Sequence, residues 1–109
     1  MAALHQIDVH GIRIYTNHGC MQEEAVIGSN YEVNISVWAD LSASAVSDDL
    51  NDTVDYVALN AIVKEEMAVR AKLLEVVCQR MIDRIMSEHP SVQKAWVNVA
   101  KLNPPINGD

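Results

Sequence analysis

Apolar and polar residues alternate along three segments of the chain. The clearest alternation runs over residues 31–39, and another runs over residues 91–101. A third covers residues 4–17, but its apolar residues change phase at His10-Gly11, where a glycine would allow a β-bulge. Because successive side chains of a strand point to opposite faces, these segments predict three half-buried strands, the first of them bulged.

Between the second and third of these strands, apolar residues recur every three or four positions, as in amphipathic helices. Asp52 and Thr53 are plausible N-caps for a helix that reaches about Val69. Its buried stripe is expected to contain Tyr56, Leu59, Ile62, Val63 and Met67. A second helix is expected over residues 72–87, with a stripe made of Leu74, Val77, Cys78, Met81 and Ile85. Residues 41–51 show no steady period, and we interpret them as a crossover.

The order strand, strand, helix, helix, strand predicts an α+β fold with both helices on one face of an antiparallel sheet. The 109 residues are enough for a single domain, residues 1–109, with one core. A sheet of three strands would leave an edge unpaired. Either a fourth strand is absent from this chain, or a neighbouring subunit covers that edge.

The composition narrows the classes of protein. The net charge of −7 argues against nucleic-acid binding, which needs a basic face. No run of Lys and Arg suggests an acidic membrane surface, no apolar run is long enough to span a membrane, and the N-terminus is too polar for a secretory signal. Cys20 and Cys78 are far apart and lack a CxxC partner, which indicates reduced thiols in a cytoplasmic protein.

Sequence motifs for several chemistries are missing. The four histidines show no metal-ligand spacing. There is no glycine-rich phosphate loop and no Gly-x-Ser-x-Gly elbow. The sequence therefore predicts neither a metal site nor a cofactor, and it argues against a serine hydrolase.

Four polar residues are candidates for chemistry, although each also has an ordinary structural explanation. Lys101 falls on the buried face at the end of the last predicted strand, where an ammonium is costly unless it is paired, used or extended into solvent. Glu75 lies in the first turn of a helix, where the helix dipole favours any carboxylate. Tyr56 fits a core tyrosine, and Glu24 fits a solvated charge in a loop. By themselves these residues indicate only a cytoplasmic α+β domain, with oligomerisation left open.

Four blocks taken together are more specific. They are His18-Gly-Cys-Met-Gln-Glu-Glu24, Asp49-Leu-Asn-Asp-Thr-Val-Asp-Tyr56, Lys72-Leu-Leu-Glu75 and Lys101-Leu-Asn-Pro-Pro-Ile106. In this order, across nearly the whole chain, they resemble dihydroneopterin aldolase, a family of the folate pathway. That family cleaves 7,8-dihydroneopterin into 6-hydroxymethyl-7,8-dihydropterin and glycolaldehyde.

The resemblance implies the tunnelling fold, in which two helices cover one face of an antiparallel sheet. Subunits of the family join their sheets edge to edge into tetrameric rings, and two rings pair into a homo-octamer. The active sites lie between adjacent subunits. The family's last strand would begin where this sequence ends, at Asp109, so we expect that strand to be absent from this chain.

The resemblance also assigns residues to pterin binding. Glu75 would anchor the pterin, because its two oxygens can accept the parallel N–H donors of the 2-amino group and N3. Leu73 and Leu74 would line the pterin site. Val54 would contact the ring from the neighbouring subunit.

For catalysis, the resemblance implies acid–base chemistry without a metal, a Schiff base or a cofactor. Lys101 would be the acid/base group, and Tyr56 of the neighbouring subunit would be a proton shuttle. Glu24 would position Lys101 and a water. The C6=N5 imine of the dihydropterin ring would itself absorb the electrons of the broken carbon–carbon bond.

Two other functions remain open at this point. One is an epimerase of the same fold that acts on the triphosphate form of dihydroneopterin. The Lys-x-Asn-Pro-Pro segment favours the aldolase, and no basic cluster suited to a triphosphate is evident. The other is a ring protein that binds a pterin or purine without catalysis.

Overall fold

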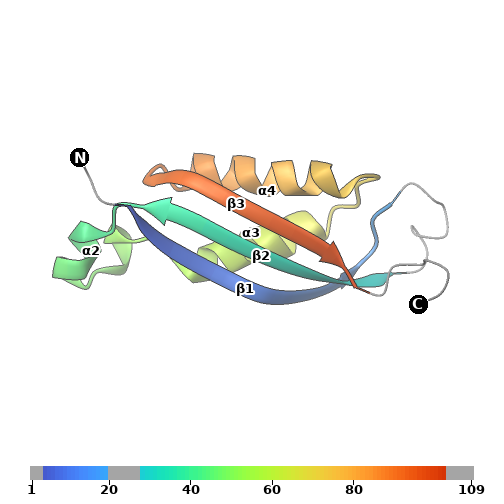
Figure 1. The fold of residues 1–109 in the computed structure, drawn as a ribbon, viewed down its shortest axis with the longest axis horizontal. Coiled ribbons are helices and arrows are strands. Elements are labelled where there is room, and N and C mark those ends of the chain that lie inside the picture. The colour runs from blue at the N-terminus through green and yellow to red at the C-terminus, as the bar shows by residue number, and fades with distance from the viewer. Residues whose placement is uncertain (1–3, 20–27, 103–109) are drawn as a thin grey trace.

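The computed structural model describes residues 4–19 and 28–102, and these contain one three-stranded antiparallel sheet. Strands β1 (His5–Thr16), β2 (Ser29–Ala39) and β3 (Val92–Lys101) lie in the order β1-β2-β3. The two long helices, α3 (Tyr56–Met67) and α4 (Leu74–Glu88), both lie behind the sheet in Figure 1. The predicted α+β arrangement, with both helices on one face, is confirmed.

The predicted bulge in β1 is also confirmed. The register between β1 and β2 shifts between Val9 and Ile12, and Gly11 adopts a φ of +74° there. A positive φ is readily available to glycine and strained for other residues. The extra residue restores the phase of the strand, so that Ile7 and Ile14, on opposite sides of the bulge, both pack against the core.

The core lies between the sheet and the helices. Strand β2 is its centre, because its inward side chains are almost completely buried. They meet the helical stripes of Leu59, Ile62, Val63 and Met67 on α3 and of Val77, Met81 and Ile85 on α4. All of these residues were predicted. Leu74 and Cys78 were also predicted for the stripe of the second helix, but they are only half-buried.

The start of α3 differs from the prediction. Asp55 is the N-cap, and its side chain accepts a hydrogen bond of 2.9 Å from the Val57 N–H. Asp52 instead belongs to the short 3₁₀ helix η1 (Leu50–Asp52), and Thr53 ends that helix. Because α3 starts at Tyr56 itself, this side chain is 66% exposed, and its expected place in the buried stripe is wrong.

The crossover from β2 to α3 contains more structure than expected. Helix α2 (Ser42–Ser47) precedes η1, and the two form one end of the molecule (Figure 1). None of the residues of α2 or η1 is buried, which explains why no apolar period marked them.

Ion pairs hold the two long helices together. Arg84 of α4 lies 3.0 Å from Glu65 and 3.1 Å from Glu66, both on α3. Arg80 also pairs with Glu66, at 3.1 Å, and donates to the Val69 carbonyl after α3. The middle of α4 is therefore attached to the end of α3 and to the residues that follow it. No helix within the described ranges is long and apolar enough to cross a membrane.

Candidate active site

The structure brings Glu75 and Lys101 to the same end of the molecule. Helix α4 runs antiparallel to β3, so the first turn of α4 and the last residues of β3 lie toward the same end of the molecule (Figure 1). Glu75 lies in that first turn, and Lys101 is the last residue of β3, where it is half-buried. The two functional groups that the resemblance assigns to pterin binding and proton transfer therefore share one end.

Cys78 shows how closely these two elements approach each other. The backbone of Val99, two residues before Lys101, lies close to the Cys78 thiol. Burial raises the pKa of the Cys78 thiol, and the nearby Glu75 carboxylate raises it further. Cys78 is thus a contact between α4 and β3, and the carboxylate of Glu75 is close enough to affect its charge.

The residues before Glu75 give this end an apolar surface. Leu73 is the N-cap of α4 and is 49% exposed, whereas Leu74 packs against the core. An exposed leucine beside a carboxylate suits a flat heterocycle that carries polar N–H groups along one edge. Leu73 can thus offer an apolar contact and Glu75 a hydrogen-bonding contact, while Leu74 packs against the core beneath them.

The segment that delivers Leu73 and Glu75 is attached to the end of β1. The Gly19 N–H donates to the Ala71 carbonyl at 2.9 Å, and the Arg70 side chain donates back to the Gly19 carbonyl. Thr16 donates to the carbonyl of Met67, the last residue of α3, at 3.1 Å. The end of β1 and the α3–α4 connection are therefore fixed to each other.

Tyr56 and Val54 lie at the opposite end of the molecule. Helix α3 begins at Tyr56, beside η1, and ends at Met67, beside Thr16 (Figure 1). At 1.5 Å of rise per residue, the helix separates Tyr56 from the Glu75 end by about 17 Å. A single chain does not bring Tyr56 together with Glu75 and Lys101.

Tyr56 and Val54 differ in what they offer to a partner. The Tyr56 side chain is largely exposed, so its hydroxyl is accessible from outside the chain. Val54 is only 3% exposed and belongs to the core, so little of its side chain is available for a ligand. Of the two, Tyr56 is the better placed to reach the site of another subunit.

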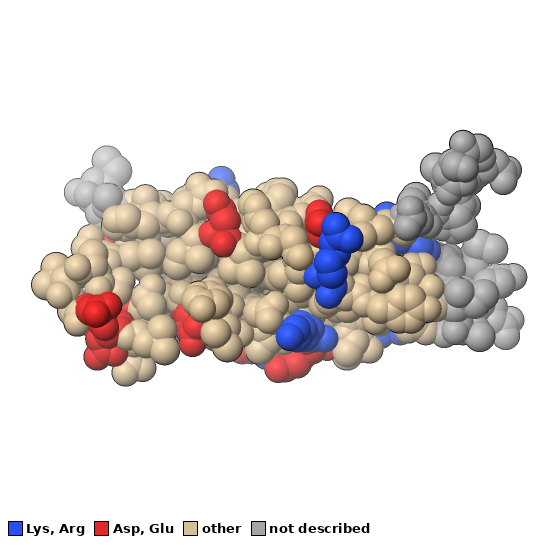
Figure 2. All heavy atoms as spheres, turned by 90° about the horizontal axis from the view of Figure 1, so that it is seen from below, with Lys and Arg blue, Asp and Glu red and all other residues tan. Residues whose placement is uncertain are grey.

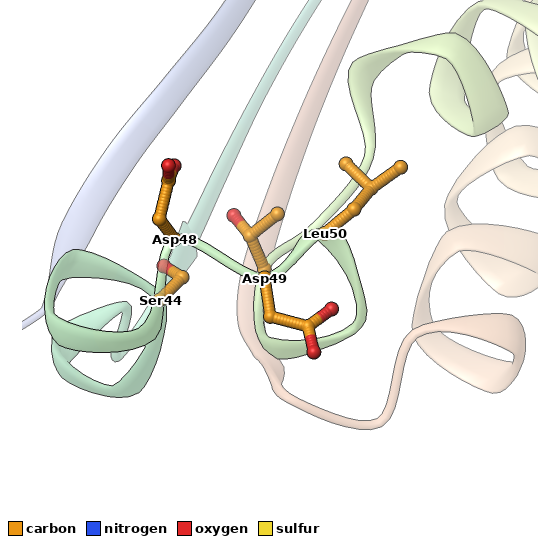
Figure 3. Close-up of a pocket in the computed structure, with 5 residues that line it drawn as sticks. Ser44, Asp48, Asp49 and Leu50 are labelled. Atoms are coloured by element: carbon orange, nitrogen blue, oxygen red, sulfur yellow. The ribbon is translucent and has the colours of Figure 1, made fainter.

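A hollow lies between α2 and η1. It has a volume of about 320 Å³ and is lined by Ser44, Asp48, Asp49, Leu50 and Thr53. Figure 3 shows its open, acidic lining, and none of the predicted site residues takes part in it. This hollow therefore does not belong to a site formed by Glu75 and Lys101.

Some predicted features lie outside the described residues. They are Glu24, Cys20 and the segment 103–106 of the last sequence block. Among the residues that the structure describes, no three His, Cys, Asp or Glu side chains form a group that could hold a metal ion.

Sequence reasoning missed two residues at the Glu75 end. Tyr31 pairs directly with Lys101 across β2 and β3, although the alternation predicted only that it is buried. His18 is also buried and bonded to the backbone of the α3–α4 connection. In the sequence, His18 stands out only as the first residue of the first motif block, beside Gly19.

Solved structures with the same architecture define the class of fold. The FolB protein of Vibrio cholerae has a TM-score of 0.83 at 22% identity, over 91% of this chain and 84% of that one. The E. coli dihydroneopterin aldolase in complex with neopterin also has a TM-score of 0.83, at 18% identity, over 89% and 84%. The fold is therefore the tunnelling fold.

Sequence comparison identifies the family within that fold. A sequence model of the dihydroneopterin aldolase family, FolB, matches residues 7–109. The chain is 31% identical over 104 residues to the Bacillus subtilis dihydroneopterin aldolase, covering 94% of this chain and 87% of the relative. It is 36% identical over 103 residues to the Staphylococcus epidermidis enzyme, covering 94% and 85%. This chain belongs to the dihydroneopterin aldolase family.

Proposed function

We propose that this protein is the aldehyde-lyase that converts 7,8-dihydroneopterin into 6-hydroxymethyl-7,8-dihydropterin and glycolaldehyde in folate biosynthesis. The observation that carries the proposal is that Glu75 and Lys101 lie at the same end of a chain of this family. We propose that this reaction takes place in the cytoplasm.

Glu75 holds the pterin in this proposal. Its two carboxylate oxygens accept the parallel N–H donors of the 2-amino group and N3, and Leu73 and Leu74 supply apolar contacts. Two relatives support this type of ligand, because the E. coli enzyme structure holds neopterin and a Burkholderia dihydroneopterin aldolase structure holds guanine. Both molecules carry an amino group next to a ring N–H, which a single carboxylate can recognise.

Lys101 moves the protons. It takes the proton of the 2′-hydroxyl through a water, the C1′–C2′ bond breaks, and glycolaldehyde leaves. The electron pair of that bond enters the C6=N5 imine and forms an enamine. Return of the proton to the enamine carbon gives the hydroxymethyl product. Glu24 positions Lys101 and the water. Tyr56 of a neighbouring subunit serves as a proton shuttle.

The active site is completed by a second copy of the chain. The supporting observation is the separation of about 17 Å along α3 between Tyr56 and the Glu75 end. A head-to-tail ring places the start of α3 of one subunit beside the Glu75 end of the next, and it also pairs the open edges of β1 and β3. We propose a tetrameric ring, with two rings forming an octamer.

The charges at the two ends support head-to-tail assembly. The α2–η1 end carries exposed Asp48, Asp49 and Asp52, whereas Arg70 and Lys72 are exposed in the segment before Glu75. Figure 2 shows acidic side chains at the α2 end of one face, with most of its lysines and arginines toward the other end. Opposite charges at the two ends favour their approach over the approach of two like ends.

The proposal is tested by incubating the assembled protein with 7,8-dihydroneopterin. We expect equal amounts of glycolaldehyde and 6-hydroxymethyl-7,8-dihydropterin, and little of either from Lys101→Ala. A protein that binds the pterin but changes only the configuration of its side chain would instead be an epimerase. A protein that binds it without any conversion would be a ring protein without catalysis.

A further inference from the structure

A buried histidine joins the end of β1 to the connection between α3 and α4. His18 is 2% exposed, and its Nε2 lies 2.9 Å from the Met67 carbonyl oxygen. Its Nδ1 lies 3.0 Å from the backbone nitrogen of Ala71. The Ala71 N–H can only donate, so Nδ1 accepts, and the imidazole proton is on Nε2 and is donated to Met67. Only the neutral ring with that proton position satisfies both bonds.

His18 also contacts the strand that faces Lys101. The ring of Tyr31 meets the His18 ring edge-on, with centroids 5.5 Å apart, and the Tyr31 hydroxyl donates to the His18 carbonyl at 3.5 Å. Tyr31 is the register partner of Lys101. One buried side chain therefore lies between the segment that leads to Glu75 and the strand position opposite Lys101.

Ala71 links His18 to the first turn of α4, which contains Glu75. Its N–H donates to His18, and its carbonyl accepts from the neighbouring Gly19, so the end of β1 holds both sides of this residue. Leu73, two residues later, begins α4 without a side-chain cap of its own. The backbone bonds of Ala71 thus help to set where the first turn of α4 starts.

We propose that His18 is a positioning residue for the pterin site, which holds the Ala71–Glu75 segment in register with the strand that carries Lys101. It touches neither substrate nor reacting atoms and acts through Ala71 and Tyr31. This inference rests on the proposed function of Glu75 and Lys101.

The arrangement depends on the charge of His18. A protonated ring carries a proton on Nδ1, which would point at the Ala71 N–H and break that bond. Burial lowers the pKa of His18 more than its bond to Met67 raises it, and the charges of Arg80 on α4 and Arg70 in the connection lower it further. From β2, the facing titratable group is the hydroxyl of Tyr31. The neutral form is complete above the ordinary value of 6.5 and is lost as the pH falls through the lowered pKa.

Two amide variants separate the bonds of His18. In His18→Asn, the side-chain oxygen replaces Nδ1 and can still accept from Ala71. In His18→Gln, the side-chain nitrogen replaces Nε2 and can still donate to Met67, but the Ala71 N–H loses its acceptor. We expect His18→Gln to weaken neopterin binding about tenfold, with a parallel rise in KM and a smaller change in kcat, and His18→Asn to stay within about threefold of wild type.

Thr16→Val is the matched control. It removes the other hydrogen bond to the Met67 carbonyl, at 3.1 Å, and leaves Ala71 untouched. We expect its neopterin affinity to stay within about twofold of wild type. If assembled His18→Gln binds neopterin as well as wild type, or loses no more affinity than Thr16→Val, His18 has no positioning role. If wild type itself neither binds neopterin nor releases glycolaldehyde, the proposed function fails instead.

A measurement on the unmodified protein does not depend on the folding of variants. Because the pterin site requires neutral His18, linkage demands that bound neopterin lower the pKa of His18. Titration of the ring nitrogens by NMR should show the proton on Nε2 at neutral pH and a further decrease of the pKa with neopterin. An unchanged pKa with the ligand bound would overturn the inference.

Discussion

Two impaired variants of this protein should recover activity when their subunits are mixed. Lys101→Ala removes the amine at the end of β3, and Tyr56→Phe removes the hydroxyl at the start of α3. Tyr56 is 66% exposed, so the loss of its hydroxyl should leave the fold intact. Because α3 separates Tyr56 from the Glu75 end by about 17 Å, a chain cannot complete the site with its own Tyr56.

The size of the recovery follows from the head-to-tail geometry. In the proposed ring, each site takes Lys101 from one subunit and Tyr56 from the next. In a random one-to-one mixture, a site is intact when a Tyr56→Phe subunit supplies the amine and a Lys101→Ala subunit supplies the hydroxyl. This combination occurs at one half times one half, or about one quarter, of the sites. A site within one chain would never be intact, and the activity would stay at the mean of the two variants.

The assay is glycolaldehyde release after the two variants are unfolded and refolded together, with mixed rings verified by native mass spectrometry. A mixture of Lys101→Ala with Glu75→Ala is the matched control, because both groups lie at one end of the same chain. It should show no recovery. The reasoning is refuted if mixed rings of the first pair remain at the mean of their parents, or if the control pair recovers equally.

Three further substitutions test single residues. Glu75→Ala should weaken neopterin binding by about 1.5–3 kcal/mol, because a charge-assisted hydrogen-bonding pair is lost; unchanged affinity in a calorimetric titration would exclude its anchoring role. Lys101→Ala should lower kcat far more than it weakens neopterin binding, and equal losses of both would mean that Lys101 only holds the substrate. Gly11→Ala should cost about 1–2 kcal/mol of unfolding free energy, because the φ of +74° is strained for alanine although no atom lies within 4 Å of the added Cβ. Gly11→Asn should cost less in the same urea titration, and an equal cost would contradict the strain argument.

The strands were predictable because each shows its alternation of apolar and polar residues within its own segment of the sequence. The phase change around Gly11 is explained by one extra residue in β1, which keeps the apolar side chains on one face of the sheet. The structure contains this extra residue. The start of α3 was not predictable in the same way, since Asp52, Thr53 and Asp55 are all suitable N-caps. The choice of Asp55 depends on η1, which uses the first two of these residues. The exposure of Tyr56 follows from that choice.

The candidate site was predictable only in part, for a different physical reason. The roles of Glu75 and Lys101 came from a resemblance, and their shared end depends on the antiparallel arrangement of α4 and β3. The contacts of His18 could not be predicted from the sequence, because its partners are backbone atoms of Met67 and Ala71, 49 and 53 residues away. Backbone groups have no residue type that a sequence pattern could reveal.

The relative position of Glu75 and Lys101 is controlled from two sides. On one side, the half-buried Cys78 in the second turn of α4 lies close to the backbone of Val99 on β3. On the other, His18 holds the segment before α4 and contacts Tyr31, the partner of Lys101. Of the two side chains that make these contacts, His18 is buried and Cys78 is half-buried. Within the described ranges, the Tyr56 side chain has no hydrogen bond or ion pair, and in the proposed ring its position relative to the Lys101 amine is set by how two subunits meet. The chemistry of this site should therefore depend on assembly more strongly than its pterin binding does.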